Sequence, residues 1–151
     1  MWERLRRFSS LPRPAKAIFL RAVFLLPLLT LSLKMRGFQA TLRSLQRTLN
    51  AKKHAQASST SEISVALSAR MVTAAARESP IHCTCLERSL ALWWLLDRQG
   101  IRSQLRIGVR KDGQKFGAHA WVERDGIAIG ESEAPHLHYA AFAEEMSGDA
   151  S

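Results

Sequence analysis

Residues 84–100 read TCLERSLALWWLLDRQG, and they carry the clearest structural signal in the chain. Thr84 and Glu87 match the S/T-x-x-E capping box, in which the Thr hydroxyl accepts a backbone N–H of the first turn and the Glu carboxylate reaches back to the cap. The apolar residues that follow recur at helical spacing until Gly100, a common helix terminator. The pattern predicts a capped helix with Cys85 in its first turn.

Beyond this helix the hydrophobic period changes from 3.6 to 2 residues. Residues 105–109 alternate between apolar and polar or small side chains, and Asp112-Gly113 is a turn signal. A second strand is expected over about 116–123, and a third begins within 127–130 after a turn at Asp125-Gly126. One helix followed by an antiparallel meander predicts an α+β fold.

The formal charge of +9 lies entirely in the N-terminal third of the chain. Residues 1–53 contain twelve Lys or Arg and one acidic residue, whereas residues 54–151 contain ten basic and twelve acidic residues. A nucleic-acid surface along the whole chain would not divide the charge in this way, so we expect no nucleic-acid partner. We expect instead that the basic part meets an acidic partner, the substrate or a membrane surface. The two cysteines are too few for a disulfide-stapled secreted scaffold.

The N-terminal part is expected to be helical. Its most apolar segment, residues 17–33, contains Arg21 and Pro27, and no small-residue cleavage pattern follows it, so a transmembrane span or a secretory signal fits poorly. We interpret this segment as a buried or partner-facing helix, with a peripheral membrane contact as the alternative. Further helices are expected over 38–49 and 62–77.

The polar, small and aperiodic residues 51–61 are typical of a linker. The sequence therefore predicts three regions, namely a basic helical region at 1–50, the linker at 51–61 and an α+β core at 62–151.

Cys85 is the first candidate for chemistry. The thiolate is the reactive form of cysteine, and the unpaired N–H groups and dipole of a helix N-terminus stabilise it. Most free cysteines are small buried hydrophobes, but a capped first turn is what a nucleophile needs. His119, in the second strand, is a suitable general base if that strand packs against the Cys-bearing helix.

A third group should orient the imidazole through its other nitrogen. Four nearby acids are available: Glu123, Asp125, Glu131 and Glu133. A three-residue turn at 124–126 would place Glu131 opposite His119, whereas a two-residue turn would place Ser132 there. We predict the three-residue turn and therefore Glu131.

A metal site is the rival interpretation of the same region. It rests on a Cys-x-Cys pattern and a His-x-His pattern. The candidate ligands are His82, Cys83, Cys85, His119, His136 and His138. Zinc accepts both ligand types, but the usual C-x₂₋₄-C pairing is missing and a first-turn Cys suits tetrahedral geometry poorly. We therefore expect no metal and no cofactor, and we treat Cys83 as incidental.

The motifs together resemble those of one family. They are CLERSLALWWLL at 85–96, GI at 100–101, LRIGV at 105–109 and FGAHAWVE at 116–123. In this order the chain from about residue 80 to 142 resembles the bacterial lasso-peptide leader peptidases, transglutaminase-like cysteine proteases that remove the leader of a ribosomally made precursor. The resemblance implies a papain/transglutaminase-like core and a Cys-His-acid triad. The triad falls on Cys85, His119 and Glu131, where the family's usual acid is Asp.

The short chain resembles the stand-alone form of that family, which is related to the microcin-type processing protein. This resemblance implies three partners: the precursor peptide, a small leader-recognition protein and an ATP-dependent cyclase that closes the macrolactam. It also implies a cytoplasmic location. Two alternatives remain open from the residues, namely a transglutaminase-like acyltransferase and a non-catalytic basic adaptor.

Overall fold

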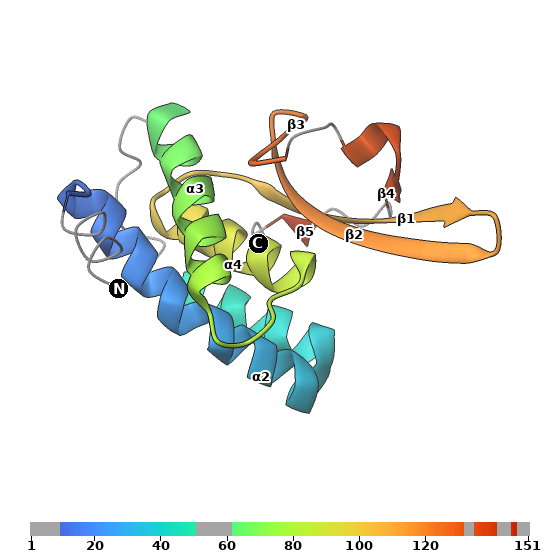
Figure 1. Ribbon diagram of the computed structural model, residues 1–151, viewed down its shortest axis with the longest axis horizontal. Helices are drawn as coiled ribbons and strands as arrows, with labels where there is room; N and C mark the ends of the chain where they lie inside the picture. The colour runs from blue at the N-terminus through green and yellow to red at the C-terminus, as the bar shows by residue number, and fades with distance from the viewer. Residues whose placement is uncertain (1–9, 51–61, 132–134, 142–145, 148–151) are drawn as a thin grey trace.

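A computed structural model describes residues 10–50, 62–131, 135–141 and 146–147. Its elements are α2 (Arg13–Asn50), α3 (Glu62–Glu78), α4 (Cys85–Arg98), β1 (Gln104–Asp112), β2 (Lys115–Arg124), β3 (Ile127–Ala128), the 3₁₀ helix η1 (Pro135–Leu137), β4 (Ala140–Ala141) and β5 (Met146–Ser147). The helices gather at one end of the molecule, and the long β1–β2 hairpin extends from them (Figure 1). The predicted α+β fold is confirmed. The predicted linker, residues 51–61, lies outside the described residues, so the three-part division of the chain stays a prediction.

α2 consists of two helical segments that meet at Gly37. This glycine has φ +77° and ψ 175°, a conformation outside the helical region that glycine adopts without a Cβ penalty. The hydroxyl oxygens of Ser32 and Thr41 are 2.7 Å apart, whereas nine residues of a straight helix would span about 13 Å. The second segment therefore folds back beside the first. The two helices predicted over 17–33 and 38–49 are these segments.

The three helices and the first two strands share one hydrophobic core. Its fully buried members include Leu26 of α2, Leu90, Trp93, Leu95 and Leu96 of α4, Leu105 of β1 and Val122 of β2. Two hydrogen bonds tie the helices at the edge of this core. Trp94 donates its indole N–H to Thr48 Oγ1 at 2.9 Å, and Gln99 donates its amide to Ser68 Oγ at 3.0 Å. These two bonds fix α4 to α2 and α3.

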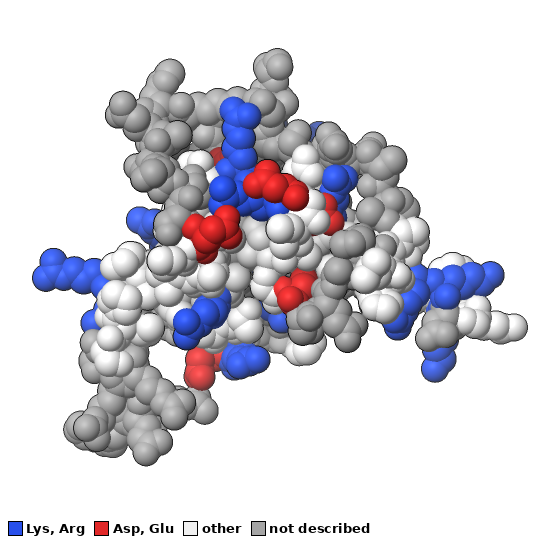
Figure 2. Space-filling model, turned by 90° about the horizontal axis from the view of Figure 1, so that it is seen from above, with Lys and Arg blue, Asp and Glu red and all other residues white. Residues whose placement is uncertain are grey.

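The sheet has the strand order β3-β2-β1-β4, and β5 also pairs with β1. β1 and β2 are antiparallel from the pair Gln104↔Glu123 to the pair Asp112↔Lys115. On the face of the molecule seen from above in Figure 2, basic and acidic side chains lie intermixed. The predicted strands over 105–109 and 116–123 are confirmed, and both are longer than expected.

The turn between β2 and β3 differs from the prediction. Arg124 pairs with Ile127, so the turn has two residues, Asp125 and Gly126. Their φ values are +52° and +77°. Two positive φ values are typical of the type I′ turn, whose twist matches that of the flanking strands. The three-residue turn was therefore the wrong choice, because Asp adopts the left-handed conformation more readily than most residues.

Candidate active site

Cys85 is the first residue of α4 and lies beside a complete capping box. The Thr84 hydroxyl accepts a hydrogen bond from the Leu86 backbone N–H at 3.3 Å, and the Thr84 N–H donates to Glu87 Oε2 at 2.9 Å. These bonds fix the start of the helix, as the sequence predicts. As the first residue of α4, Cys85 lies at the positive end of the helix dipole. Cys85 forms no disulfide and is only half-buried, so its thiol is accessible to a substrate.

A buried hydrogen bond fixes this end of α4 to β2. Ser89 donates its hydroxyl to the Ala120 carbonyl oxygen at 2.8 Å. Ser89 lies one turn after Cys85, and residues four apart share a helix face. Ala120 directly follows His119 in β2. The bond therefore brings the Cys-bearing face of α4 to the part of β2 that carries His119.

A pocket opens where α4, α3 and the chain after β3 meet. Its polar wall combines Cys85, Arg88 and Ser89 with Glu131, and its apolar wall comes from Ala69, Val72, Leu92, Ala120 and Ile129. Thr73 and Gly130 complete the lining. A thiol and a carboxylate thus line the same pocket, which is the arrangement expected of a site where a substrate would bind.

The His119 ring lies beside two aromatic rings, whose own centroids are 6.5 Å apart, and meets a carboxylate. Its centroid is 6.0 Å from the Trp121 ring, nearly parallel to it, and 5.3 Å from the Tyr139 ring. His119 Nε2 lies 3.3 Å from Glu131 Oε2. With Nε2 directed at the carboxylate, Nδ1 is the ring nitrogen that is left to receive a thiol proton.

Glu131 reaches His119 by a route that the sequence did not predict. The two-residue turn, continued in register, would place Ser132 opposite His119. The last bond in this register runs from the Ile129 N–H to the Val122 carbonyl oxygen at 2.8 Å, however, and Gly130 has φ +74°, so the chain then bends out of the strand. The bend brings Glu131 to the ring one residue before the register would. The predicted contact forms, although its predicted cause was wrong, and the catalytic role of Glu131 stays a prediction.

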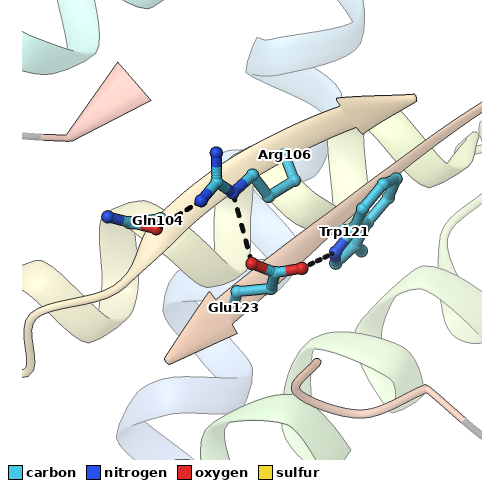
Figure 3. A network of polar contacts seen from close by, with 4 residues as sticks. All are labelled: Gln104, Arg106, Trp121 and Glu123. Carbon is cyan, nitrogen blue, oxygen red and sulfur yellow. Dashed lines mark hydrogen bonds and ion pairs between the residues drawn. The ribbon is translucent and has the colours of Figure 1, made fainter. Parts of the chain in front are cut away.

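A second carboxylate, Glu123, lies on the same face of β2 but serves a different purpose. It is buried and accepts hydrogen bonds from Trp121 Nε1 at 2.8 Å and from Arg106 Nε at 3.2 Å (Figure 3). Arg106 Nη2 also donates to Gln104 Oε1 at 3.0 Å. A buried carboxylate needs such partners. Glu123, one of the four acids considered, therefore holds Trp121, which packs on His119.

The signal for this network lies in the alternation of β2. His119, Trp121 and Glu123 follow one another at a spacing of two residues, so the three side chains share one face of the strand. What the sequence could not supply was the partner on the neighbouring strand. Arg106 pairs with Trp121 across β1 and β2, which brings its guanidinium to Glu123.

Three of the remaining Cys and His candidates, Cys83, His82 and His138, do not line the pocket. Cys83 donates its thiol to the Ile81 carbonyl oxygen at 3.4 Å, and His82 and His138 are exposed. The side chain of His136 lies outside the described part of the chain. Within the described residues, no group of three or more His, Cys, Asp or Glu side chains is placed to hold a metal ion.

Comparison with known proteins places the chain in a family. The family model described as the transglutaminase-like superfamily matches residues 23–144, a segment that contains Cys85, His119 and Glu131. No curated protein and no solved structure matches the chain. The match covers most of the chain and starts within α2. The chain therefore belongs to the transglutaminase-like superfamily, whose fold serves cysteine peptidases and acyltransferases.

Proposed function

We propose that the protein is a cysteine peptidase with Cys85 as nucleophile, His119 as general base and acid, and Glu131 as the group that orients His119. The observation that carries this proposal is the 3.3 Å contact between His119 Nε2 and Glu131 Oε2. His119 is in β2, and Ser89, which lies one turn after Cys85 in α4, donates a hydrogen bond to this strand. Cys85 and Glu131 also line the same pocket, which supports the assignment of a nucleophile, a base and an orienting acid to these three residues.

The chemistry follows from this arrangement. His119 Nδ1 takes the Cys85 thiol proton, and the thiolate attacks the carbonyl carbon of the scissile peptide bond. The Cys85 backbone N–H, the first of α4, has no acceptor within the helix and is suited to stabilise the developing oxyanion. His119 then gives its proton to the leaving amine, and the peptide C–N bond breaks. Water, deprotonated by His119, hydrolyses the thioester and releases the acid and free Cys85.

The Glu131 carboxylate supports the charged stage of the cycle. When His119 holds the thiol proton it is an imidazolium, and a carboxylate at Nε2 stabilises that charge. The Glu131 side chain is 30% exposed, so solvent screens part of this stabilisation. Glu in place of the Asp that is usual among leader peptidases adds one methylene, and the bend at Gly130 supplies the backbone freedom to accommodate it.

The substrate that we propose is the leader–core junction of a ribosomally made lasso-peptide precursor. The support for this choice is the motif resemblance at 85–96 and 116–123. We further propose that a small leader-recognition protein presents the precursor in the cytoplasm and that an ATP-dependent cyclase receives the freed core.

Cys85→Ala tests the proposal. Wild-type protein, precursor peptide and the leader-recognition protein should yield separate leader and core, quantified by liquid chromatography and mass spectrometry. Removing the nucleophile should lower the cleavage rate by about 10³-fold or more. Cys83→Ala is the matched control, because Cys83 lies two residues away, donates its thiol to the Ile81 carbonyl and packs against the edge of the core. It should cleave at the wild-type rate. Undiminished cleavage by Cys85→Ala would overturn the proposal.

The same assay distinguishes hydrolysis from acyl transfer. A primary amine added in excess should leave the carboxylate product dominant if water is the natural acceptor. A product whose mass equals that of the acyl fragment plus the amine, formed in place of the acid, would identify an acyltransferase and contradict the peptidase assignment.

A further inference from the structure

The first segment of α2 exposes a row of large apolar side chains. We call this row the α2 outer stripe, and its members are Leu20 (46% exposed), Phe24 (71%), Leu28 (62%), Leu31 (55%) and Met35 (76%). Spacings of four, four, three and four residues place them on one face of the helix. The opposite face is covered, because Ala15, Ile18, Ala22, Leu26 and Leu29 are buried in the shared core. The segment is therefore apolar on two faces, and the described chain covers only one of them.

The size of the stripe sets it apart from ordinary surface apolar residues. From Leu20 to Met35 it runs for about 22 Å along the helix. Other exposed large apolar residues are scattered over different elements, among them Phe116 in β2, Ile127 in β3 and Leu137 in η1. Isolated exposed apolar residues are common, but a continuous row indicates a surface that another body covers.

The charge of α2 indicates what that body is. The helix contains seven Lys or Arg residues and no Asp or Glu. Arg21 and Lys34 are exposed, and at 100° per residue they lie on opposite flanks of the stripe. Arg13, also exposed, precedes the stripe at the start of the helix. An apolar row that is flanked by cations and contains no acidic residue complements a surface with a negatively charged outer layer over an apolar interior.

The packing of α2 shows that the helix would lie on such a surface and not cross it. By length and composition α2 could span a membrane, but the same test is met by core helices of soluble proteins. A spanning helix would have to withdraw Ala22, Leu26 and Leu29 from the core that it shares with α3 and α4. A helix lying flat keeps this packing intact.

We propose that the first segment of α2 docks in the plane of an anionic lipid membrane. The outer stripe lies beneath the headgroups, and Arg21 and Lys34 reach the lipid phosphates on either side. Apolar burial supplies the attraction along the stripe, and the cations restrict it to negatively charged membranes. The inference stands apart from the proposed cleavage reaction, which needs no lipid.

The test is co-sedimentation of the full-length protein with vesicles. The protein should bind phosphatidylcholine vesicles that contain phosphatidylglycerol, and added salt should weaken this binding. Vesicles of phosphatidylcholine alone should bind it about tenfold less. Alkaline carbonate should release the bound protein, because nothing spans the bilayer. Absence of binding to the anionic vesicles, equal binding to both kinds, or resistance to carbonate would each overturn the proposal.

A matched pair of variants locates the contact. Phe24→Gln should lower the vesicle partition coefficient at least about tenfold, as expected when one buried Phe is lost. Phe116→Gln removes an equally exposed Phe from β2, 75% against 71%, and should bind vesicles as wild type does. Equal behaviour of the two variants would overturn the assignment to α2. Binding to a leader-recognition protein that Phe24→Gln abolishes, with no vesicle binding, would identify a protein interface instead.

Discussion

The two connections of β2 are built in opposite ways, and each delivers one member of the proposed His–acid pair. On one side β2 pairs with β1 in an unbroken ladder from Glu123 to Lys115, and His119 sits within it opposite Gly108. On the other side β2 pairs with β3 through two residue pairs only, and the chain then bends toward Glu131. The strand that carries His119 is therefore held by many backbone hydrogen bonds, and the segment that carries Glu131 by few. The comparison indicates that the acid is the adjustable partner of the pair.

Glu131→Gln should have the largest effect of the variants that probe this comparison. The amide keeps the size of the side chain but cannot stabilise an imidazolium as a carboxylate does, so kcat/KM should fall about 10²-fold. Glu131→Asp keeps the charge, and the lightly paired segment can move to restore the contact, so it should stay within about tenfold of wild type. Both values come from initial rates of precursor cleavage. Wild-type activity in Glu131→Gln would remove Glu131 from the mechanism.

Glu123→Gln probes the firmly held side of the pair. The amide has a single oxygen in place of two, so an NH₂ group faces either Trp121 or Arg106, and the charge-assisted bond at 3.2 Å is lost. Because the substitution leaves this buried network partly unpaired, it should lower the free energy of unfolding by about 2 kcal/mol. Because Trp121 packs on His119, kcat should fall several-fold while KM changes little.

Urea unfolding and steady-state kinetics measure these two effects. Asp125→Asn is the matched control, since it makes the same carboxylate-to-amide change on an exposed side chain of the β2–β3 turn. Surface ion pairs contribute little, so its stability should stay within about 0.5 kcal/mol of wild type. If Glu123→Gln matches this control in both stability and kcat, the Trp121 network does not position His119.

The same contrast explains what the sequence could and could not predict. The capping box, the position of Cys85 and the strand that carries His119 depend on residues close together in the chain, and the structure has them as predicted. The site of Glu131 depends on counting through a turn. An Asp with positive φ shortens that turn by one residue, and the Gly130 bend reverses the consequence. Two errors of one residue thus cancelled, which spacing alone cannot reveal.

Long-range contacts were the other limit of the sequence. Two helices were predicted in the region of α2, but not the reversal at Gly37 that joins the Ser32 and Thr41 hydroxyls. Nor could the sequence show that one face of the apolar segment is covered and the other open. Both facts depend on which surfaces α3 and α4 occupy, and helical periodicity within one segment carries no such information.

Gly130→Ala should have a smaller effect on cleavage than Glu131→Gln and tests the bend most directly. Alanine at φ +74° is strained by about 1–2 kcal/mol. Its Cβ would also lie 3.1 Å from the Ala69 Cβ of α3, so the bend must move by a few tenths of an ångström. Because Glu131 is the next residue, kcat/KM should fall by about three- to tenfold.

Gly113→Ala separates strain from displacement in that experiment. Gly113 has φ +61° but no neighbour within 4 Å of an added Cβ, and it lies in the β1–β2 turn. It should lose stability to about the same extent in thermal unfolding and cleave at the wild-type rate. If both variants lose activity equally, lower stability is the cause. If Gly130→Ala alone is impaired, Glu131 depends on the bend for its position, and the weakly paired side of β2 sets the geometry of the proposed triad.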